Sequence, residues 1–119
     1  QIHVHPDNPS VVILEVDHLD RQMNLYDLRA SNFNTRPSLE FGHREAERSG
    51  AQRYSKGSID GRRSLFARGF DGDGTVHLWD YRNTEEVIKR FQRQREPVTH
   101  TVLSGDSVIA YGGYRVTFW

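Results

Sequence analysis

The chain has 119 residues, enough for one domain, and its 16 basic and 16 acidic residues balance, so net charge does not favour nucleic acid or an anionic membrane as a partner. The lack of cysteine excludes a disulfide framework and a thiolate zinc site, and the longest apolar run, Val11 to Leu14, is far too short to span a membrane. We therefore expect a soluble intracellular protein of the nucleus or cytoplasm.

Apolar residues alternate in short bursts along the chain, which is typical of half-buried strands and not of amphipathic helices. Turn-forming pairs such as Asp60-Gly61 and Gly112-Gly113 separate the bursts. The predicted strands are Val11 to Val16, Gln22 to Asp27, Ser64 to Phe70, Thr75 to Trp79, Val98 to Leu103, Ser107 to Tyr111 and Arg115 to Trp119. This layout predicts an all-β chain of antiparallel hairpins.

Two stretches depart from simple alternation. Residues 44–56 are polar and lack an apolar stripe, which favours a long surface loop over a helical turn. The segment after Glu85 has a helix-like composition, but Asn83-Thr84 and Pro97 bracket Val87 to Phe91 as a strand-sized unit, and we predict an outer strand there.

The chain repeats one type of strand ending three times. The endings are Met23-Asn24-Leu25-Tyr26-Asp27-Leu28-Arg29, Val76-His77-Leu78-Trp79-Asp80-Tyr81-Arg82 and Val116-Thr117-Phe118-Trp119. Their aromatic residues Tyr26, Trp79 and Trp119 are 53 and 40 residues apart, and the second interval matches the period of a propeller blade. The polar loop at 44–56 accounts for the longer first interval.

The second copy carries the most specific motif. Its Asp71-Gly72-Asp73-Gly74-Thr75 turn, followed by a strand ending in Trp79-Asp80, resembles the last inner hairpin of a WD-repeat blade, and Phe41-Gly42-His43 resembles the Gly-His pair that opens such a repeat. The resemblance implies a buried network of His43, Trp79 and one of the two turn aspartates. It also implies structural roles for the residues at the repeat endings, which are Tyr26, Asp27, Trp79, Asp80 and Trp119. The third copy departs from the pattern, with Arg95-Glu96-Pro97 in place of Gly-His.

The resemblance implies β-propeller blades, each a four-stranded antiparallel sheet, in approximate repeats 1–42, 43–95 and 96–119. Because propellers typically have four to eight blades, three repeats predict an incomplete ring that leaves two apolar sheet faces uncovered. We expect the remaining blades of the protein, or a second copy of the chain, to cover them. The fourth strand of the last blade comes from an N-terminal segment in many such propellers, and a domain cut in mid-course is the alternative.

Two successive endings share an aromatic-Asp-x-Arg motif, with Arg29 and Arg82 as the arginines. This resembles the paired motif of WD propellers that act as substrate receptors of cullin-RING ubiquitin ligases, in which the arginine contacts the adaptor. Pairing of each arginine with a neighbouring carboxylate on the rim is the alternative explanation. We expect a protein-interaction scaffold and not an enzyme, with Arg29 and Arg82 as its partner-binding residues.

A different function is suggested by the region 44–68, which holds seven basic and three acidic residues. A chromatin or nucleic-acid contact is the hypothesis, although the excess is too small to give phosphate affinity alone.

Three arrangements with possible chemistry are each incomplete. Asp71, Asp73 and Thr75 occupy the first positions of a calcium loop, but Arg82 stands where the bidentate glutamate belongs. His3 and His5 have same-side spacing without a third ligand nearby. The residues Ser104, Ser107, Asp106 and His100 lack the turn that exposes a nucleophilic serine. We therefore expect no catalytic, cofactor or metal site.

Overall fold

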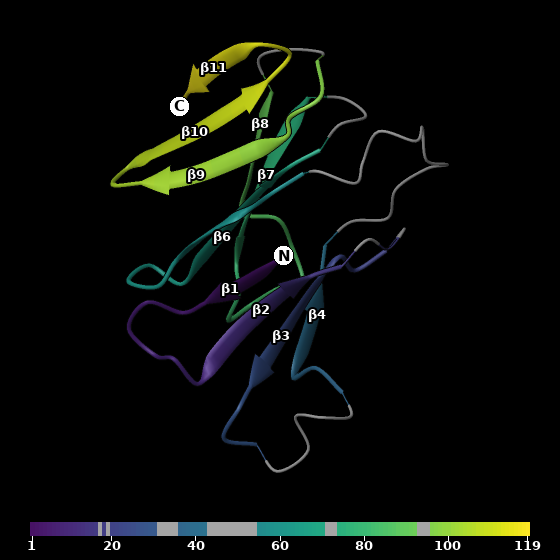
Figure 1. The fold of residues 1–119 in the computed structure, drawn as a ribbon, viewed down its shortest axis with the longest axis vertical. Helices are drawn as coiled ribbons and strands as arrows, with labels where there is room; N and C mark the ends of the chain where they lie inside the picture. The colour runs from purple at the N-terminus through teal and green to yellow at the C-terminus, as the bar shows by residue number, and fades with distance from the viewer. Residues whose placement is uncertain (17, 19, 31–35, 43–54, 71–73, 93–95) are drawn as a thin grey trace.

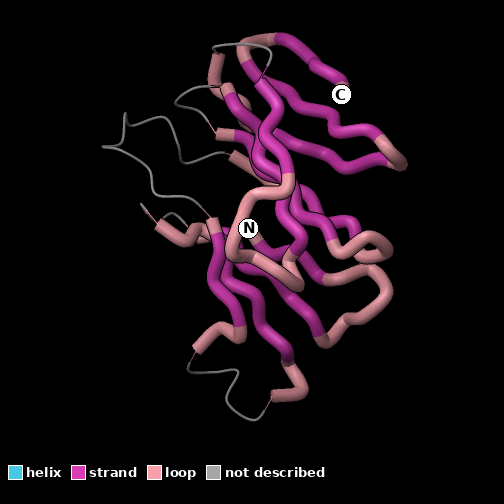
Figure 2. The backbone as a smooth tube through the Cα atoms, turned by 180° about the vertical axis from the view of Figure 1, so that it is seen from behind, coloured by secondary structure: helices cyan, strands magenta, loops and turns pink. Residues whose placement is uncertain are grey.

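The computed structural model describes residues 1–16, 18, 20–30, 36–42, 55–70, 74–92 and 96–119. These residues form three antiparallel sheets, called here the first, second and third sheets in chain order. Figure 1 shows the first sheet at the bottom, the second in the middle and the third at the top, and Figure 2 shows the same arc from behind. The arc does not close on itself, which confirms the expected fold class: an all-β chain of antiparallel blade sheets in an incomplete ring.

Each sheet is a meander whose strands pair in chain order, because short connections favour antiparallel neighbours. The strands are β1 (Ile2–Val4), β2 (Val11–Glu15), β3 (Met23–Asp27) and β4 (Leu39–Phe41) in the first sheet, β5 (Ser58–Asp60), β6 (Leu65–Gly69), β7 (Thr75–Asp80) and β8 (Lys89–Gln92) in the second, and β9 (His100–Ser104), β10 (Ser107–Gly112) and β11 (Arg115–Phe118) in the third.

The paired Asp-Gly steps between β6 and β7 predict a tight hairpin turn with a glycine at positive φ. Gly74 has φ of 70°, and the amide of Phe70 donates to the carbonyl of Thr75 at 2.8 Å, which confirms this part of the prediction. Asp71 to Asp73 lie outside the described residues, so the expectations of a metal-free turn and of a network aspartate stay predictions.

The first and second sheets pack through a core of large side chains. Trp79 is 1 % exposed and its ring lies 5.8 Å from that of Phe41 on β4 and 6.2 Å from that of Phe70. The other buried members of this core are Ile13, Met23, Leu25, Phe66 and Tyr81. The implied burial of Trp79 is therefore confirmed, and its side chain lies between the first and second sheets.

The second and third sheets pack through smaller side chains. Ala67, Val76 and Leu78 of the second sheet meet Val108 and Ala110 of the third. The Val98 side chain lies so close to Gly69 that a Cβ there would be 2.1 Å from it, so this glycine permits the approach of the two sheets.

Strand registers define equivalent positions in the three sheets. Tyr26 pairs with Val12, Trp79 pairs with Phe66, and Trp119 exchanges backbone hydrogen bonds with Val108. Alternation along β7 sends Trp79 toward the first sheet and Leu78 toward the third. By the same register Tyr26 faces away from the second sheet, and Trp119 faces toward it.

The two ends of the arc expose the faces that are buried inside it. On the third sheet Val102, Val116 and Phe118 are 50 %, 56 % and 58 % exposed, although their equivalents His3, Met23 and Leu25 are buried in the first. At the other end Ile2 and Val4 on β1 are more than half exposed. Each end therefore presents an apolar sheet face that the interior of the arc covers with another sheet.

Candidate functional site

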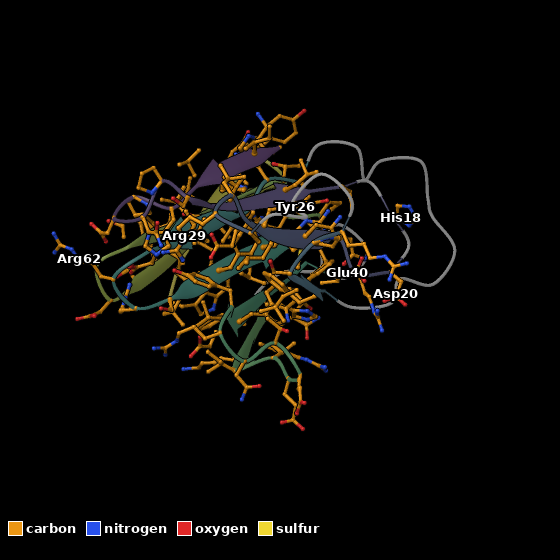
Figure 3. The ribbon with its side chains drawn as sticks, turned by 90° about the horizontal axis from the view of Figure 1, so that it is seen from below. His18, Asp20, Tyr26, Arg29, Glu40 and Arg62 are labelled. Atoms are coloured by element: carbon orange, nitrogen blue, oxygen red, sulfur yellow. The ribbon has the colours of Figure 1, made fainter. Side chains whose placement is uncertain are left out.

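The meander topology brings two kinds of connection to one rim of the arc. The turns after β1, β5 and β9 lie there, and so do the segments after β3 and β7. Neighbouring turns are in contact, because a Cβ on Gly61 would lie 2.6 Å from Pro6 Cγ. Figure 3 shows Arg29 and Arg62 at this side of the molecule and His18 and Asp20 at the other. We call the rim residues Asp27, Arg29, Asp60, Arg63, Asp80 and Arg82 the Asp–Arg rim.

The two aromatic-Asp-x-Arg motifs adopt the same local geometry. Arg29 donates to Asp27 from its backbone amide at 3.0 Å, from Nε at 2.9 Å and from Nη2 at 2.7 Å. Arg82 makes the same three bonds to Asp80 at 2.9, 2.9 and 2.7 Å. Each carboxylate therefore fixes its own arginine two residues later in a bidentate pair.

This pairing leaves part of each guanidinium facing solvent. The side chains of Arg29 and Arg82 are 67 % and 68 % exposed, and among the described residues no bond is made by Nη1 of either. An arginine with one edge anchored and the other open has fewer rotamers to lose when an acceptor binds. Each arginine therefore pairs with a neighbouring carboxylate, as the alternative explanation of the motif expects. It still presents free N–H donors to a partner.

The pairs also set the charge state of the rim. The hydrogen bond from the Arg29 side chain lowers the pKa of Asp27 to about 2, and that from Arg82 lowers the pKa of Asp80. In the folded protein the pKa of Asp27 lies below the usual value of an aspartate, so the pair of Asp27 with Arg29 stabilises the fold at pH values above that usual value. This stabilisation is lost as the pH falls through about 2. Both carboxylates stay ionised at neutral pH.

A third carboxylate joins the rim to the third sheet. Asp60 accepts from Nε of Arg63 at 2.6 Å, and the same guanidinium contacts the Gly105 carbonyl and Asp106 Oδ1. Burial tends to raise the pKa of Asp60, but the hydrogen bonds from Arg63 outweigh it and the pKa is lowered. Arg63 is therefore occupied between two sheets, unlike Arg29 and Arg82.

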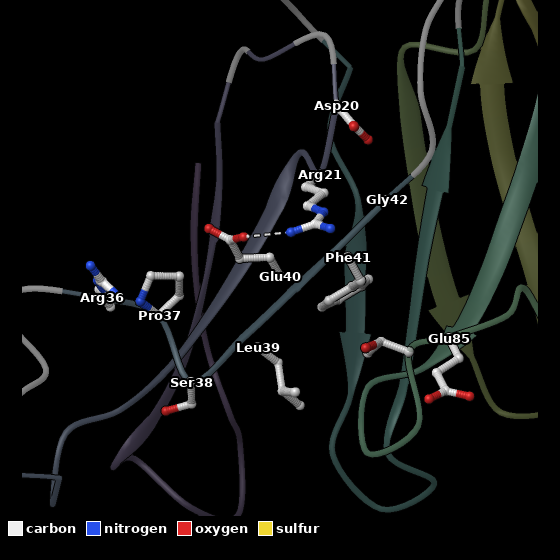
Figure 4. A pocket seen from close by; sticks show the side chains of 11 residues that line it. Asp20, Arg21, Arg36, Pro37, Ser38, Leu39, Glu40, Phe41, Gly42 and Glu85 are labelled. Atoms are coloured by element: carbon white, nitrogen blue, oxygen red, sulfur yellow. Dashed lines mark hydrogen bonds and ion pairs between the residues drawn. The ribbon is translucent and has the colours of Figure 1, made fainter.

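A groove runs along the outer strand β4 of the first sheet. Its volume is about 830 Å³, and it extends from Asp20 and Arg21 to Thr84 and Glu85 of the second sheet. Arg21 donates to Glu40 at 3.2 Å across one wall, as Figure 4 shows. The walls mix three carboxylates with two arginines, so the groove favours neither charge.

A buried charged cluster joins the first and second sheets, and the sequence analysis missed it. Glu15 Oε1 lies 2.6 Å from His3 Nε2 and accepts from the Gly57 amide at 2.7 Å, while Oε2 lies 3.7 Å from Arg68 Nε. His3, Glu15 and Arg68 are all less than 9 % exposed. The signal in the sequence was weak: single charged residues inside predicted strands, with no local partner.

The two N-terminal histidines do not meet as a metal pair. His3 points into the cluster with Glu15, whereas His5 lies in the turn before Pro6 and accepts from the amides of Asp7 and Asn8. In the described part of the chain no three His, Asp or Glu side chains converge as a metal site requires.

The other candidate residues are separated or fall outside the description. Ser104 and Ser107 pair across the β9–β10 hairpin, but His100 pairs with Tyr111, four residues up the strand and roughly 13 Å away, so the serines and histidine are not assembled. His43 lies outside the described residues, and its place in the implied network stays a prediction.

The basic region 44–68 is described from residue 55 onward. Within that part Arg68 is buried beside Glu15, and Arg63 is paired with Asp60 and Asp106. Lys56 and Arg62 are exposed. The described portion therefore offers two exposed cations and no continuous basic patch.

Two further observations bear on function. The described residues include no helix with the length and apolar character needed to cross a bilayer. No protein-family model matches the chain, and no curated protein matches it significantly.

Proposed function

We propose that the chain is a segment of a WD-repeat propeller that acts as a protein-interaction scaffold and not as an enzyme. The supporting observation is the repeated Asp-x-Arg pair, which presents the outer edges of Arg29 and Arg82 at equivalent positions on one rim. Further blades, or a second copy, complete the ring. In its specific form, the proposal is a substrate receptor whose two arginines contact the adaptor of a cullin-RING ubiquitin ligase.

The chemistry of the rim fits a protein partner with exposed acceptors. A free guanidinium edge binds carboxylates and backbone carbonyls through parallel hydrogen bonds. Because Asp27 and Asp80 already neutralise their arginines, the rim carries little net charge. Binding at this rim therefore depends on hydrogen-bond geometry more than on long-range attraction.

Charge reversal at both arginines tests the proposal. We expect Arg29→Glu combined with Arg82→Glu to weaken binding to a purified ligase adaptor at least tenfold, measured by biolayer interferometry, because two anchored donors become repelled carboxylates. Arg115→Glu is the matched control, since Arg115 is exposed at the start of β11, at the opposite rim. Circular dichroism of each variant confirms folding. Unchanged adaptor binding by the double variant, or none by the wild-type chain, would contradict the receptor proposal.

A further inference from the structure

The turn after β1 is held by the side chain of His5. Its Nδ1 accepts hydrogen bonds from the backbone amides of Asp7 at 3.1 Å and Asn8 at 3.0 Å. An imidazole nitrogen that accepts a hydrogen bond has no proton of its own, so the neutral ring carries its single proton on Nε2. A second proton can bind only at Nδ1, where it faces two N–H donors. Protonation of His5 therefore breaks both hydrogen bonds that this side chain accepts.

The equivalent turn of the second sheet is built in the same way around a carboxylate. The registers of β1 with β2 and of β5 with β6 place His5 and Asp60 at equivalent positions. Asp60 Oδ1 accepts from the amides of Arg62 at 3.1 Å and Arg63 at 3.3 Å, two and three residues later, as His5 Nδ1 does in the first sheet. Burial tends to raise the pKa of Asp60, but hydrogen bonds from the two arginines lower it overall, so this carboxylate still accepts in mildly acidic solution. The first sheet thus has a proton-sensitive acceptor where the second has one that stays ionised.

A short series of hydrogen bonds connects this turn to the Asp–Arg rim. The amide of Asn8 is held by His5, and Asn8 Oδ1 in turn accepts from the amide of Ser10 at 3.2 Å. The Ser10 carbonyl accepts from the Leu28 amide at 2.7 Å, and Leu28 stands directly before Arg29. A turn that loses its bonds to His5 therefore loosens the backbone on which Arg29 is mounted.

The surroundings of His5 offer no buried charge that would favour its protonation. Its ring lies edge to face with that of Tyr81 at 6.0 Å between centres, and a Cβ on Gly61 would be 2.8 Å from His5 Cε1. The titratable and charged groups of its own turn and of the elements packed around it are Asp7, Asp27, Arg29, Asp60, Arg62, Arg63, Asp80, Tyr81 and Arg82. All of these carboxylates except Asp7 are paired with an arginine, and Asp7 is exposed to solvent. Among the described residues, a protonated His5 therefore gains no buried counter-charge for the two hydrogen bonds it loses.

We propose that His5 is a proton-sensitive support of the Asp–Arg rim, which holds the backbone at Arg29 in place at neutral pH and releases it in mildly acidic solution. Arg82 keeps its support, because Asp60 stays ionised and its turn holds the amide of Tyr81. Partner binding through Arg29 therefore weakens as the pH falls, although Asp27 remains ionised. The effect on binding rests on the proposed function of the rim, whereas the change in the turn does not.

Amide hydrogen exchange of the full chain, followed by NMR, tests the change in the turn. It is measured at about pH 8 and about pH 5, between which an imidazole ordinarily changes charge. The rates are expressed as protection factors, which remove the ordinary dependence of exchange on pH. We expect the protection of the Asp7, Asn8 and Leu28 amides to fall about tenfold or more in acid, since each lost hydrogen bond accounts for roughly a factor of five. The Arg62 and Tyr81 amides, at the equivalent places in the second sheet, are internal controls and should keep their protection.

Two substitutions assign the effect to His5. His5→Asp gives the first sheet the acceptor that the second sheet already has, so the Leu28 amide should stay protected at both pH values while the other histidines titrate as before. His5→Ala removes the acceptor and should leave Leu28 weakly protected at both. Protection of Leu28 that does not fall in the wild-type chain, or that falls equally in His5→Asp, overturns the proposal.

Adaptor binding tests the consequence for the rim. Biolayer interferometry compares the wild-type chain with His5→Asp at the same two pH values. We expect the affinity of the wild type to fall in acid by about threefold more than that of the variant, because Arg29 must be ordered again on binding. Equal losses of affinity overturn the role of His5 at the rim. A chain that binds no adaptor at either pH contradicts the receptor proposal, and the exchange of the Leu28 amide then still decides whether His5 controls the turn.

Discussion

Single residues in this fold differ in importance according to which face of a sheet they occupy. Trp79, Tyr26 and Trp119 hold equivalent positions, but Trp79 alone among them is fully buried. The sequence predicts all three at strand ends, and the structure places them at matching strand registers; their role as repeat endings stays a prediction. Their different burial depends on which neighbouring sheet is present, which the local pattern does not contain.

Replacing Trp79 with alanine should lower the free energy of unfolding by roughly 3–5 kcal/mol, because its ring fills the core between two sheets. Tyr26→Ala, at the equivalent but half-buried position, should cost less than half as much. Urea denaturation of both variants measures the difference. Equal losses at the two positions would contradict the assignment of faces.

Glu15 is the residue on which the buried charged cluster depends. Glu15→Ala removes the carboxylate beside His3 and Arg68 and the acceptor of the Gly57 amide, so we expect a loss of about 3–5 kcal/mol in unfolding free energy. Glu40→Ala is the control, because its exposed pair with Arg21 is worth less than about 1 kcal/mol. A Glu15→Ala variant as stable as Glu40→Ala would show that the cluster does not hold the two sheets together.

At the scale of elements, the apolar pattern of the sequence predicts the longer strands and not the shortest ones. Seven strands have clear apolar alternation and lie close to the predicted ranges: β2, β3, β6, β7, β9, β10 and β11. The outer strand predicted at Val87 to Phe91 appears as β8, Lys89–Gln92. The pattern does not predict β1, β4 and β5, which have three residues each. Three residues show at most one alternation, and these strands form because a longer neighbour offers a free edge.

The charged cluster was missed for a different reason. Glu15 and Arg68 are 53 residues apart in sequence and lie on strands of two different sheets. No spacing rule connects such residues before the sheets are placed side by side. The pairs of Arg29 and Arg82 could be anticipated because each carboxylate lies two residues away, whereas the role of these arginines in partner binding stays a prediction.

At the scale of the whole molecule, the arc leaves one apolar face uncovered at each end. We expect the isolated chain to self-associate with increasing concentration, because burying these faces releases apolar surface from water. Val102→Lys combined with Val116→Lys should shift the sedimentation profile toward monomer, whereas Lys56→Ala, at an exposed polar position, should not. A cooperatively unfolding monomer at all concentrations would contradict the incomplete ring as the state of this chain.

The second sheet, unlike the two at the ends, has both faces covered. Its β7 sends Trp79 to one core and Leu78 to the other, so adjacent residues of a single strand serve two different interfaces. A change of twist or position in this strand is transmitted in both directions along the arc, while a change on β1 or β11 reaches one neighbour. Mutational tolerance should therefore rise from the middle of the arc toward its ends, and freedom to acquire new surface contacts should be greatest in the end sheets.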